Sequence, residues 1–140
     1  MKGRIVKLGG IAVATAIGFA TLVSVVQAQG DVIKDRQELM KSQGAAMKAI
    51  NGILEANGPL ADIAPQAAKL EETSAKIADL FPAGSDQGDT KAKPEIWQNP
   101  DDFAAKAKDL HEQAAMLSTA VAGGDMAAVK AQYEKVGGAC

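Results

Sequence analysis

The sequence is poor in the side chains on which most enzymes and disulfide-rich proteins depend. Its 140 residues include one cysteine, one histidine, one tyrosine, one tryptophan and three phenylalanines. A single cysteine excludes a framework of intrachain disulfides, and no cluster of metal ligands occurs at a recognisable spacing. A Ser-His-acid set and a phosphate-binding glycine loop are missing too. We therefore predict that the protein is not an enzyme.

The chain also lacks an excess of positive charge. Its formal net charge is −2, from 15 Lys and Arg against 17 Asp and Glu. Removing residues 1–28 removes three basic side chains and no acidic one, which leaves 12 against 17 and a net charge of −5. Because a nucleic-acid surface needs basic side chains to meet the phosphates, we exclude nucleic acid as a partner.

Residues 1–28 have the pattern of an export signal. A basic start (Lys2, Arg4 and Lys7) precedes an apolar run over residues 8–26, and Val26-Gln27-Ala28 has the compact residues of a cleavage site. The apolar run is near the length of a membrane-spanning helix, which is the alternative interpretation. We expect cleavage after Ala28, a periplasmic location, and a mature domain over residues 29–140 without a membrane anchor.

The mature segment is rich in alanine and has no runs of β-branched residues, which predicts an all-α fold. Apolar residues recur at intervals of three and four over residues 31–56, 65–81, 100–121 and 125–140, as in amphipathic helices around a common core. We expect an up-down-up-down antiparallel four-helix bundle, with Asn99 and Asp125 as caps and the last helix cut short. Ile96 and Trp97 are expected to anchor the long loop between the second and third helices over the core.

Two polar residues interrupt the apolar stripe of the first predicted helix. The stripe reads Ile33, Arg36, Met40, Gln43, Met47, Ile50 and Leu54. A buried guanidinium without a counter-charge is costly, so Arg36 either meets an anion or reaches solvent from its place near the helix start. Beside the stripe, the small residues at positions 44–46 allow close approach of another backbone or of a flat ligand.

The only cysteine ends the apolar stripe of the last predicted helix. Because Met126, Val129, Tyr133 and Val136 lead to Cys140 at helical spacing, we expect its sulfur to face the core. A second cysteine three residues later, followed by a histidine, would complete the C-x-x-C-H signature of covalent haem attachment. Gly137-Gly138 would leave room for a flat group. We therefore expect the reading frame to continue beyond Cys140; the alternatives are a structural thiol or an intermolecular disulfide.

Several short segments together resemble the cytochrome c′ family, exported four-helix bundles that hold haem c covalently near the C-terminus. The resemblance spans residues 31–140. It rests on Arg36-Gln37 followed by Met40, on Leu80-Phe81-Pro82-Ala83-Gly84-Ser85, on Lys91-Ala92-Lys93-Pro94-Glu95-Ile96-Trp97, on Gly124-Asp125, and on Val136-Gly137-Gly138-Ala139-Cys140.

The resemblance implies roles for particular residues. Met40 would lie over the open, distal face of the haem, while Arg36 and Gln37, with Thr90 or Lys91, would meet its propionates. Cys140 would form the first thioether, and the histidine that binds the iron is expected beyond Cys140. The resemblance further implies electron transfer with a redox partner protein, binding of diatomic gases such as NO and CO, and a homodimer formed through the first two helices.

Two other functions stay open on the sequence alone. One is a haem-free exported bundle that acts as a scaffold or interaction module, with Cys140 free or in a disulfide-linked dimer. The other is a noncovalent, b-type haem held by Met40 and His111. The latter requires His111 to turn inward, although it lies one position off the apolar stripe of its helix and is expected to face solvent.

Overall fold

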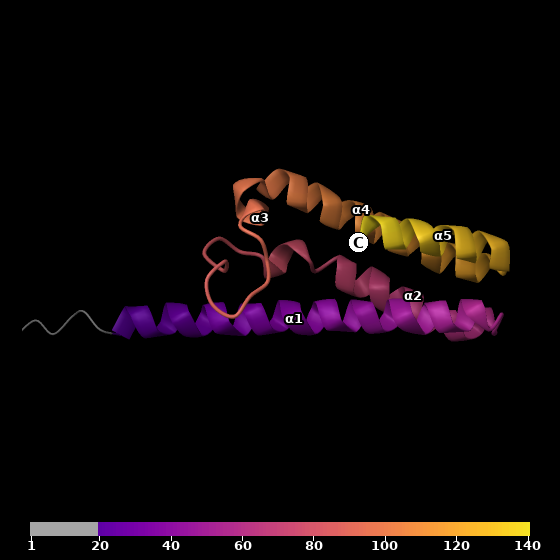
Figure 1. Ribbon diagram of the computed structural model, residues 1–140, viewed down its shortest axis with the longest axis horizontal. Coiled ribbons are helices and arrows are strands. Elements are labelled where there is room, and N and C mark those ends of the chain that lie inside the picture. Colours follow the sequence, from indigo (N-terminus) through magenta and orange to yellow (C-terminus); the bar gives the residue numbers. More distant parts are fainter. Residues whose placement is uncertain (1–19) are drawn as a thin grey trace, which may run out of the picture.

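The computed structural model describes the backbone of residues 20–140 and the side chains of residues 31–140, which form an antiparallel four-helix bundle (Figure 1). The four long helices run up, down, up and down: α1 (Ala20–Glu55), α2 (Leu60–Ser74), α4 (Pro100–Gly123) and α5 (Met126–Ala139). This confirms the predicted all-α bundle. Residues 1–19 of the predicted signal peptide lie outside the described residues.

The core is built from the apolar stripes of all four long helices. α2 packs against both α1 and α4, and α5 packs against α4. The most deeply buried side chains, at 2% exposure or less, include Ile50, Ile63, Ala67, Leu70, Ala114, Leu117, Val129 and Val136. Each large aliphatic side chain removed from water contributes about 1.5–3 kcal/mol, so these contacts dominate the stability of the bundle.

α1 and α5 are held together near one end of the bundle. The Tyr133 hydroxyl donates to the Met47 carbonyl at 3.1 Å, and Lys130 Nζ donates to Asn57 Oδ1 at 2.9 Å. Close backbone contact between these two helices is otherwise sparse. The candidate site lies between α1 and the C-terminal end of α5.

α2 differs from the predicted helix over residues 65–81 at both ends. It begins at Leu60, so Pro65 lies inside the helix rather than at its first position. Pro65 leaves one backbone hydrogen bond of the second turn unmade, but burial of Ile63 at 0% exposure keeps the preceding turn helical. At the other end, the Ser74 hydroxyl donates back to the Glu71 carbonyl at 3.0 Å, which favours helix termination.

The connection from α2 to α4 contains a 3-10 turn, η1 (Ala78–Leu80), and a short helix, α3 (Glu95–Gln98), which the spacing of apolar residues did not predict. Trp97 anchors this connection as expected. Its Nε1 donates to the Pro82 carbonyl at 2.9 Å, and its ring lies 6.0 Å from that of Phe81. The Phe81 ring is in turn 4.6 Å from that of Phe103 on α4.

The two predicted caps behave differently. Asp125 precedes α5, and its carboxylate accepts hydrogen bonds from the Ala127 and Ala128 amides, as expected of an N-cap. Asn99 precedes α4, but its side chain makes no capping hydrogen bond. It donates instead to the Glu95 carbonyl at 3.4 Å, back toward α3.

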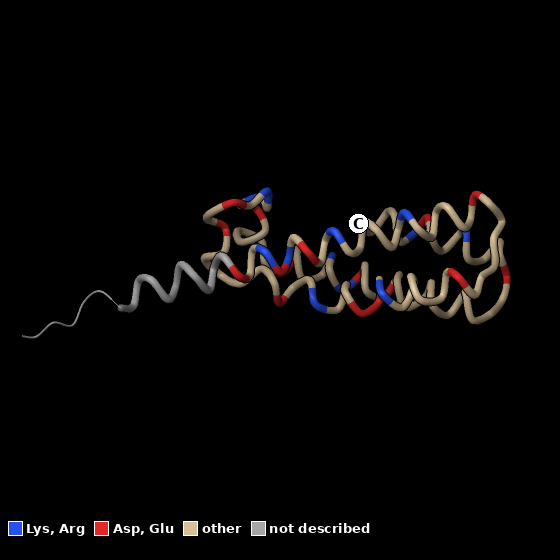
Figure 2. Tube along the Cα trace, turned by 90° about the horizontal axis from the view of Figure 1, so that it is seen from below, with Lys and Arg blue, Asp and Glu red and all other residues tan. Residues whose placement is uncertain are grey.

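Acidic and basic residues are interspersed along the helices of the bundle (Figure 2). The ion pairs among the described residues all join positions four apart on one helix, and their side chains are about half exposed or more. Such surface pairs contribute little to stability. No helix in the described part of the chain combines the length and the apolar character that crossing a membrane requires.

Candidate functional site

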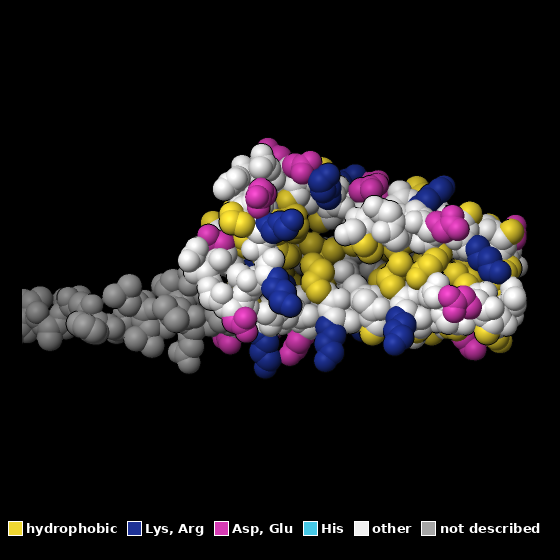
Figure 3. Space-filling view, viewed as in Figure 1, with side chains coloured by type: hydrophobic (Ala, Val, Ile, Leu, Met, Phe, Trp, Pro, Cys, Tyr) yellow, Lys and Arg dark blue, Asp and Glu magenta, His cyan; other side chains and the backbone are white. Residues whose placement is uncertain are grey.

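A cavity of about 560 Å³ opens between α1 on one side and α4 and α5 on the other. In Figure 3, apolar side chains gather in the hollow between these layers. The volume is within the range of sites for cofactor-sized ligands, roughly 300–1,000 Å³. The wall is mostly apolar, and its side chains include Met40, Met47, Ile77, Phe103, Ala107, Leu110 and Ala139.

The wall on the α1 side follows from helical spacing. Met40, Gln43, Gly44 and Met47 recur at intervals of three and four residues, so they lie on one face of the helix, and all four border the cavity. The sequence thus predicted the face correctly, including the unusual presence of Gln43 on it. Lys106 and Cys140 supply the other polar atoms of the wall.

Two glycines keep the cavity open from opposite sides. A Cβ built on Gly44 would meet no atom within 4 Å, and one built on Gly137 would come no closer than 4.0 Å to Met47 Cε. Both glycines border the cavity, so any side chain there would occupy its space. Glycine inside a helix costs about 1 kcal/mol relative to alanine. Their presence therefore favours a broad, flat occupant.

Cys140 lies at the C-terminal end of α5 and borders the cavity. Its amide donates to the Val136 carbonyl at 3.2 Å, so helical geometry extends to the cysteine. The thiol is free and the residue is partly solvent-exposed, which corrects the expectation that it is directed fully into the core. Partial burial raises the pKa of the Cys140 thiol, so the thiol is protonated at neutral pH.

Arg36 is buried at 3% exposure, which excludes the interpretation that it extends into solvent. Nη1 donates to Ser85 Oγ at 3.1 Å, and Nη2 donates to the Ser85 carbonyl at 2.6 Å and to Thr90 Oγ1 at 2.9 Å. The guanidinium also lies 4.9 Å from the centre of the Phe81 ring and 5.5 Å from that of Trp97. Burial lowers the pKa of Arg36.

No carboxylate of residues 31–140 forms an ion pair with the buried guanidinium of Arg36. All its partners among the described side chains are neutral oxygens or aromatic rings. Because an isolated buried charge is unfavourable, the environment favours binding of an anionic group near Arg36.

Gln37 and Thr90 join Arg36 at the same loop. Gln37 Nε2 donates to the Asp89 carbonyl at 2.8 Å, and Thr90 Oγ1 accepts both from Arg36 and from the Ala92 amide, the latter at 3.1 Å. The structure thus divides the five predicted site residues into two groups. Met40 and Cys140 border the cavity, whereas Arg36, Gln37 and Thr90 meet one helical turn away from Met40 and do not line it.

Ser85 is a residue of this region whose role the sequence did not reveal. It is 1% exposed, it accepts two hydrogen bonds from Arg36, and its hydroxyl donates to the Pro82 carbonyl at 2.8 Å. A second cavity, of about 640 Å³, lies beside the neighbouring aromatic rings, but none of the five predicted site residues lines it.

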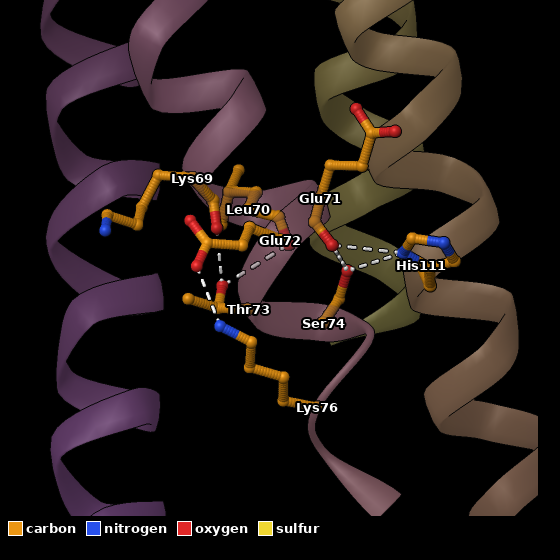
Figure 4. Close-up of polar contacts among 8 residues, drawn as sticks. All are labelled: Lys69, Leu70, Glu71, Glu72, Thr73, Ser74, Lys76 and His111. Carbon is orange, nitrogen blue, oxygen red and sulfur yellow. Dashed lines mark hydrogen bonds and ion pairs between the residues drawn. The ribbon is translucent and has the colours of Figure 1, made fainter.

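His111 faces α2 rather than the cavity or open solvent (Figure 4). Its Nδ1 is 3.1 Å from the Glu71 carbonyl oxygen and 3.2 Å from Ser74 Oγ, at the end of α2. His111 is not among the residues that border the cavity. The structure therefore does not bring it together with Met40, which argues against a b-type haem held by this pair.

Four-helix bundles hold cofactors between facing helices, and this bundle has an apolar cavity of cofactor size at such a place, with Cys140 at its edge and the buried Arg36 one helical turn from Met40. Residues 31–140 match the family model described as Cytochrome C′. The chain is 37% identical to the cytochrome c′ of Rhodopseudomonas palustris over 100% of this chain and 92% of that relative. It therefore belongs to the cytochrome c′ family of c′-type haem proteins, whose prosthetic group is haem c and whose members are periplasmic.

Solved structures agree with the family assignment. Cytochrome c′ from Thermochromatium tepidum superposes with a TM-score of 0.76 at 29% identity, over 80% of this chain and 89% of that chain. The nitric oxide complex of a variant of cytochrome c prime from Alcaligenes xylosoxidans gives a TM-score of 0.72 at 26% identity, over 80% and 89% of the two chains. Both similarities confirm the bundle architecture.

The residues around the cavity fit haem c. The cavity is apolar and of cofactor size, glycines border it on two sides, and a thiol lies at its mouth. Its wall also contains Gln43, whose buried Nε2 has no hydrogen-bond partner in the described part of the chain. A buried polar group without a partner is rare in folded proteins and needs an explanation.

Proposed function

We propose that the protein holds haem c in the cavity between α1 and α5 and uses it for electron transfer and for binding diatomic gases. The supporting observation is that Met40, on the first helix, and Cys140, at the end of the last helix, border one apolar cavity. When bound, haem supplies a redox-active iron whose reactivity is controlled by the polarity and accessibility of the surrounding pocket. The protein residues contribute attachment, charge compensation and control of access.

Cys140 attaches the group. Its thiol would add across a haem vinyl group, with the sulfur on one carbon and the hydrogen on the other, so the thioether would need no oxidant. The position of the thiol at the cavity mouth supports this role.

Arg36, Gln37 and Thr90 orient the propionates. The three side chains already meet at the loop over residues 82–94, one helical turn from Met40. The buried guanidinium lacks an anion among the described residues, and a propionate would provide one. Charge-assisted hydrogen bonds are stronger than neutral ones, so propionate binding would offset the cost of burying Arg36.

Met40 controls access to the distal face. Its side chain is 39% exposed and borders the cavity, so it lies where a small ligand would enter. An apolar wall excludes anions and admits small neutral molecules. The nitric oxide complex of the Alcaligenes xylosoxidans protein supports diatomic binding as a function of this fold.

The cellular context follows the family. We propose export by cleavage after Ala28, electron exchange with a redox partner protein, no enzymatic turnover, and a homodimer formed through α1 and α2. A solved cytochrome c′ with ligand-controlled dimer dissociation supports the dimer. Of the small residues at 44–46, Gly44 borders the cavity and Ala46 is buried at 2% exposure. These two positions therefore face the interior of the bundle and not a dimer surface.

Purification of the periplasmic protein from its native host tests the proposal. We expect a Soret band that survives extraction with acid acetone, which removes noncovalent haem only, and a haem mass on the peptide that contains Cys140. Cys140→Ser should lose the haem mass from that position. A colourless, well-folded protein with a free thiol would refute the proposal and support the haem-free scaffold. Haem removed by the extraction would refute covalent attachment.

A further inference from the structure

Gln43 is a buried polar residue of the cavity wall to which the proposed function gives no role. It is buried at 7% exposure, it borders the cavity, and it lies on α1 between Met40 and Met47. Its Nε2 is the single buried side-chain nitrogen or oxygen without a hydrogen-bond partner in the described part of the chain. The apolar residues on either side of it along the wall cannot provide one.

A second buried glutamine shows what a satisfied amide looks like in this fold. Gln132 on α5 has a similar exposure of 8%. Its Nε2 donates to the Gln113 carbonyl at 3.0 Å and to Gln113 Oε1 at 2.9 Å. Burying an amide without a partner costs free energy that a hydrogen bond would offset. The contrast indicates that Gln43 is placed for a partner that the polypeptide does not provide.

We infer that Gln43 donates a hydrogen bond to a small ligand held on the Met40 side of the cavity. This inference rests on the proposed function, because the haem would hold that ligand. Met40 and Gln43 are three residues apart, so they share one face of α1. The terminal torsion of a glutamine rotates readily, which allows the amide to direct its N–H groups toward the cavity.

The inference makes Gln43 a residue that determines ligand specificity. The expected ligand is a neutral diatomic with an acceptor atom at its outer end, such as CO, NO or O₂. A hydrogen bond inside an apolar cavity is electrostatically stronger than one in water. Gln43 should therefore stabilise ligands that accept a hydrogen bond, in a wall where Met40 and Met47 provide only contact.

The experiment compares Gln43→Met with Gln132→Met in the full chain, using carbon monoxide as the probe. Methionine keeps the length of glutamine but removes the amide. In the haem-loaded, reduced protein, we expect Gln43→Met to raise the C–O stretching frequency and to speed CO dissociation by roughly two- to tenfold, the loss of about one hydrogen bond. Gln132→Met should leave both unchanged.

The haem-free protein provides a readout that does not involve ligand binding. There, Gln43→Met should unfold at the same urea concentration as the parent or a higher one, because no hydrogen bond is lost. Gln132→Met should unfold at a lower concentration, because the two hydrogen bonds from Gln132 to Gln113 are lost. Equal losses in the two variants would overturn the inference, since Gln43 would then have a partner within the protein.

The remaining outcomes are also decisive. An unchanged C–O frequency in Gln43→Met, or a haem-loaded protein that forms no CO adduct, would overturn the inference while leaving haem binding intact. A protein without a Soret band would overturn the proposed function and this inference together, so the two failures are distinguishable.

Discussion

Removal of the Arg36 side chain should destabilise the haem-free protein by releasing the loop over residues 82–94. In Arg36→Met the three hydrogen bonds to Ser85 and Thr90 are lost. Hydrogen bonds to charged groups contribute about 1.5–3 kcal/mol each, but those from one side chain are not additive. The substitution also removes the cost of burying an unpaired cation, which offsets part of the lost stability. Ser85, at 1% exposure, is left without its hydrogen-bond donor. The loss of the hydrogen bonds should therefore outweigh the gain from removing the buried charge.

The net decrease in the free energy of unfolding should be roughly 2–4 kcal/mol, measured by urea denaturation with circular dichroism. Trp97 is the only tryptophan, so its fluorescence reports on the loop and should change at lower urea in the variant. Lys34→Met is the matched control on the same helix. Its ion pair with Glu38, at 3.9 Å, is exposed and should contribute less than about 0.5 kcal/mol. Equal stabilities of the two variants would refute the role of Arg36.

Two further predictions concern capping and pH. Asp125→Ala should lower the free energy of unfolding by about 1 kcal/mol, whereas Asn99→Ala, which removes no capping hydrogen bond, should change it by less than about 0.5 kcal/mol; urea denaturation checks both. Burial raises the pKa of the Cys140 thiol and of the Tyr133 phenol, so the folded state holds both protons more tightly than the unfolded state. The contribution of these two groups to the stability of the haem-free protein should be fully present below the ordinary thiol pKa of about 8.5 and fall as the pH rises above it. Cys140→Ala should weaken this fall in a pH series of unfolding curves, and an identical fall would contradict the assignment.

The spacing of apolar residues predicted the helices well because a helix must bury one face in the core. The predicted stripes mark the buried faces of α1, α4 and α5, except that Met40 and Cys140 are exposed. The stripe predicted over residues 65–81 continues past the end of α2, so Ile77 and Phe81 lie outside that helix. Asp125 caps α5 as the local sequence indicated. The start of α2 was predicted five residues late, because proline is most frequent in the first turn and the burial of Ile63 overrides that preference. Its end depends on Ser74 and on His111 from another helix, which no local pattern contains.

The candidate site was predictable where it follows helix periodicity. Met40 and Gln43 share the cavity face of α1. Arg36 is buried one turn earlier, which decides between the two alternatives that the sequence left open. The contacts of Arg36 with Ser85 and Thr90 join residues about fifty positions apart. They depend on the path of a loop, for which the sequence has no periodic signal.

The central claim, that the cavity between α1 and α5 holds the haem, is tested most directly by filling it. Gly44 and Gly52 both lie inside α1, and a Cβ at either position would meet no atom within 4 Å, but only Gly44 borders the cavity. Leucine should stabilise the helix by about 0.8 kcal/mol at either position in the haem-free protein. The measurement is the ratio of Soret absorbance to protein. We predict the parental ratio for Gly52→Leu and a large loss for Gly44→Leu; equal ratios in the two variants would contradict the account.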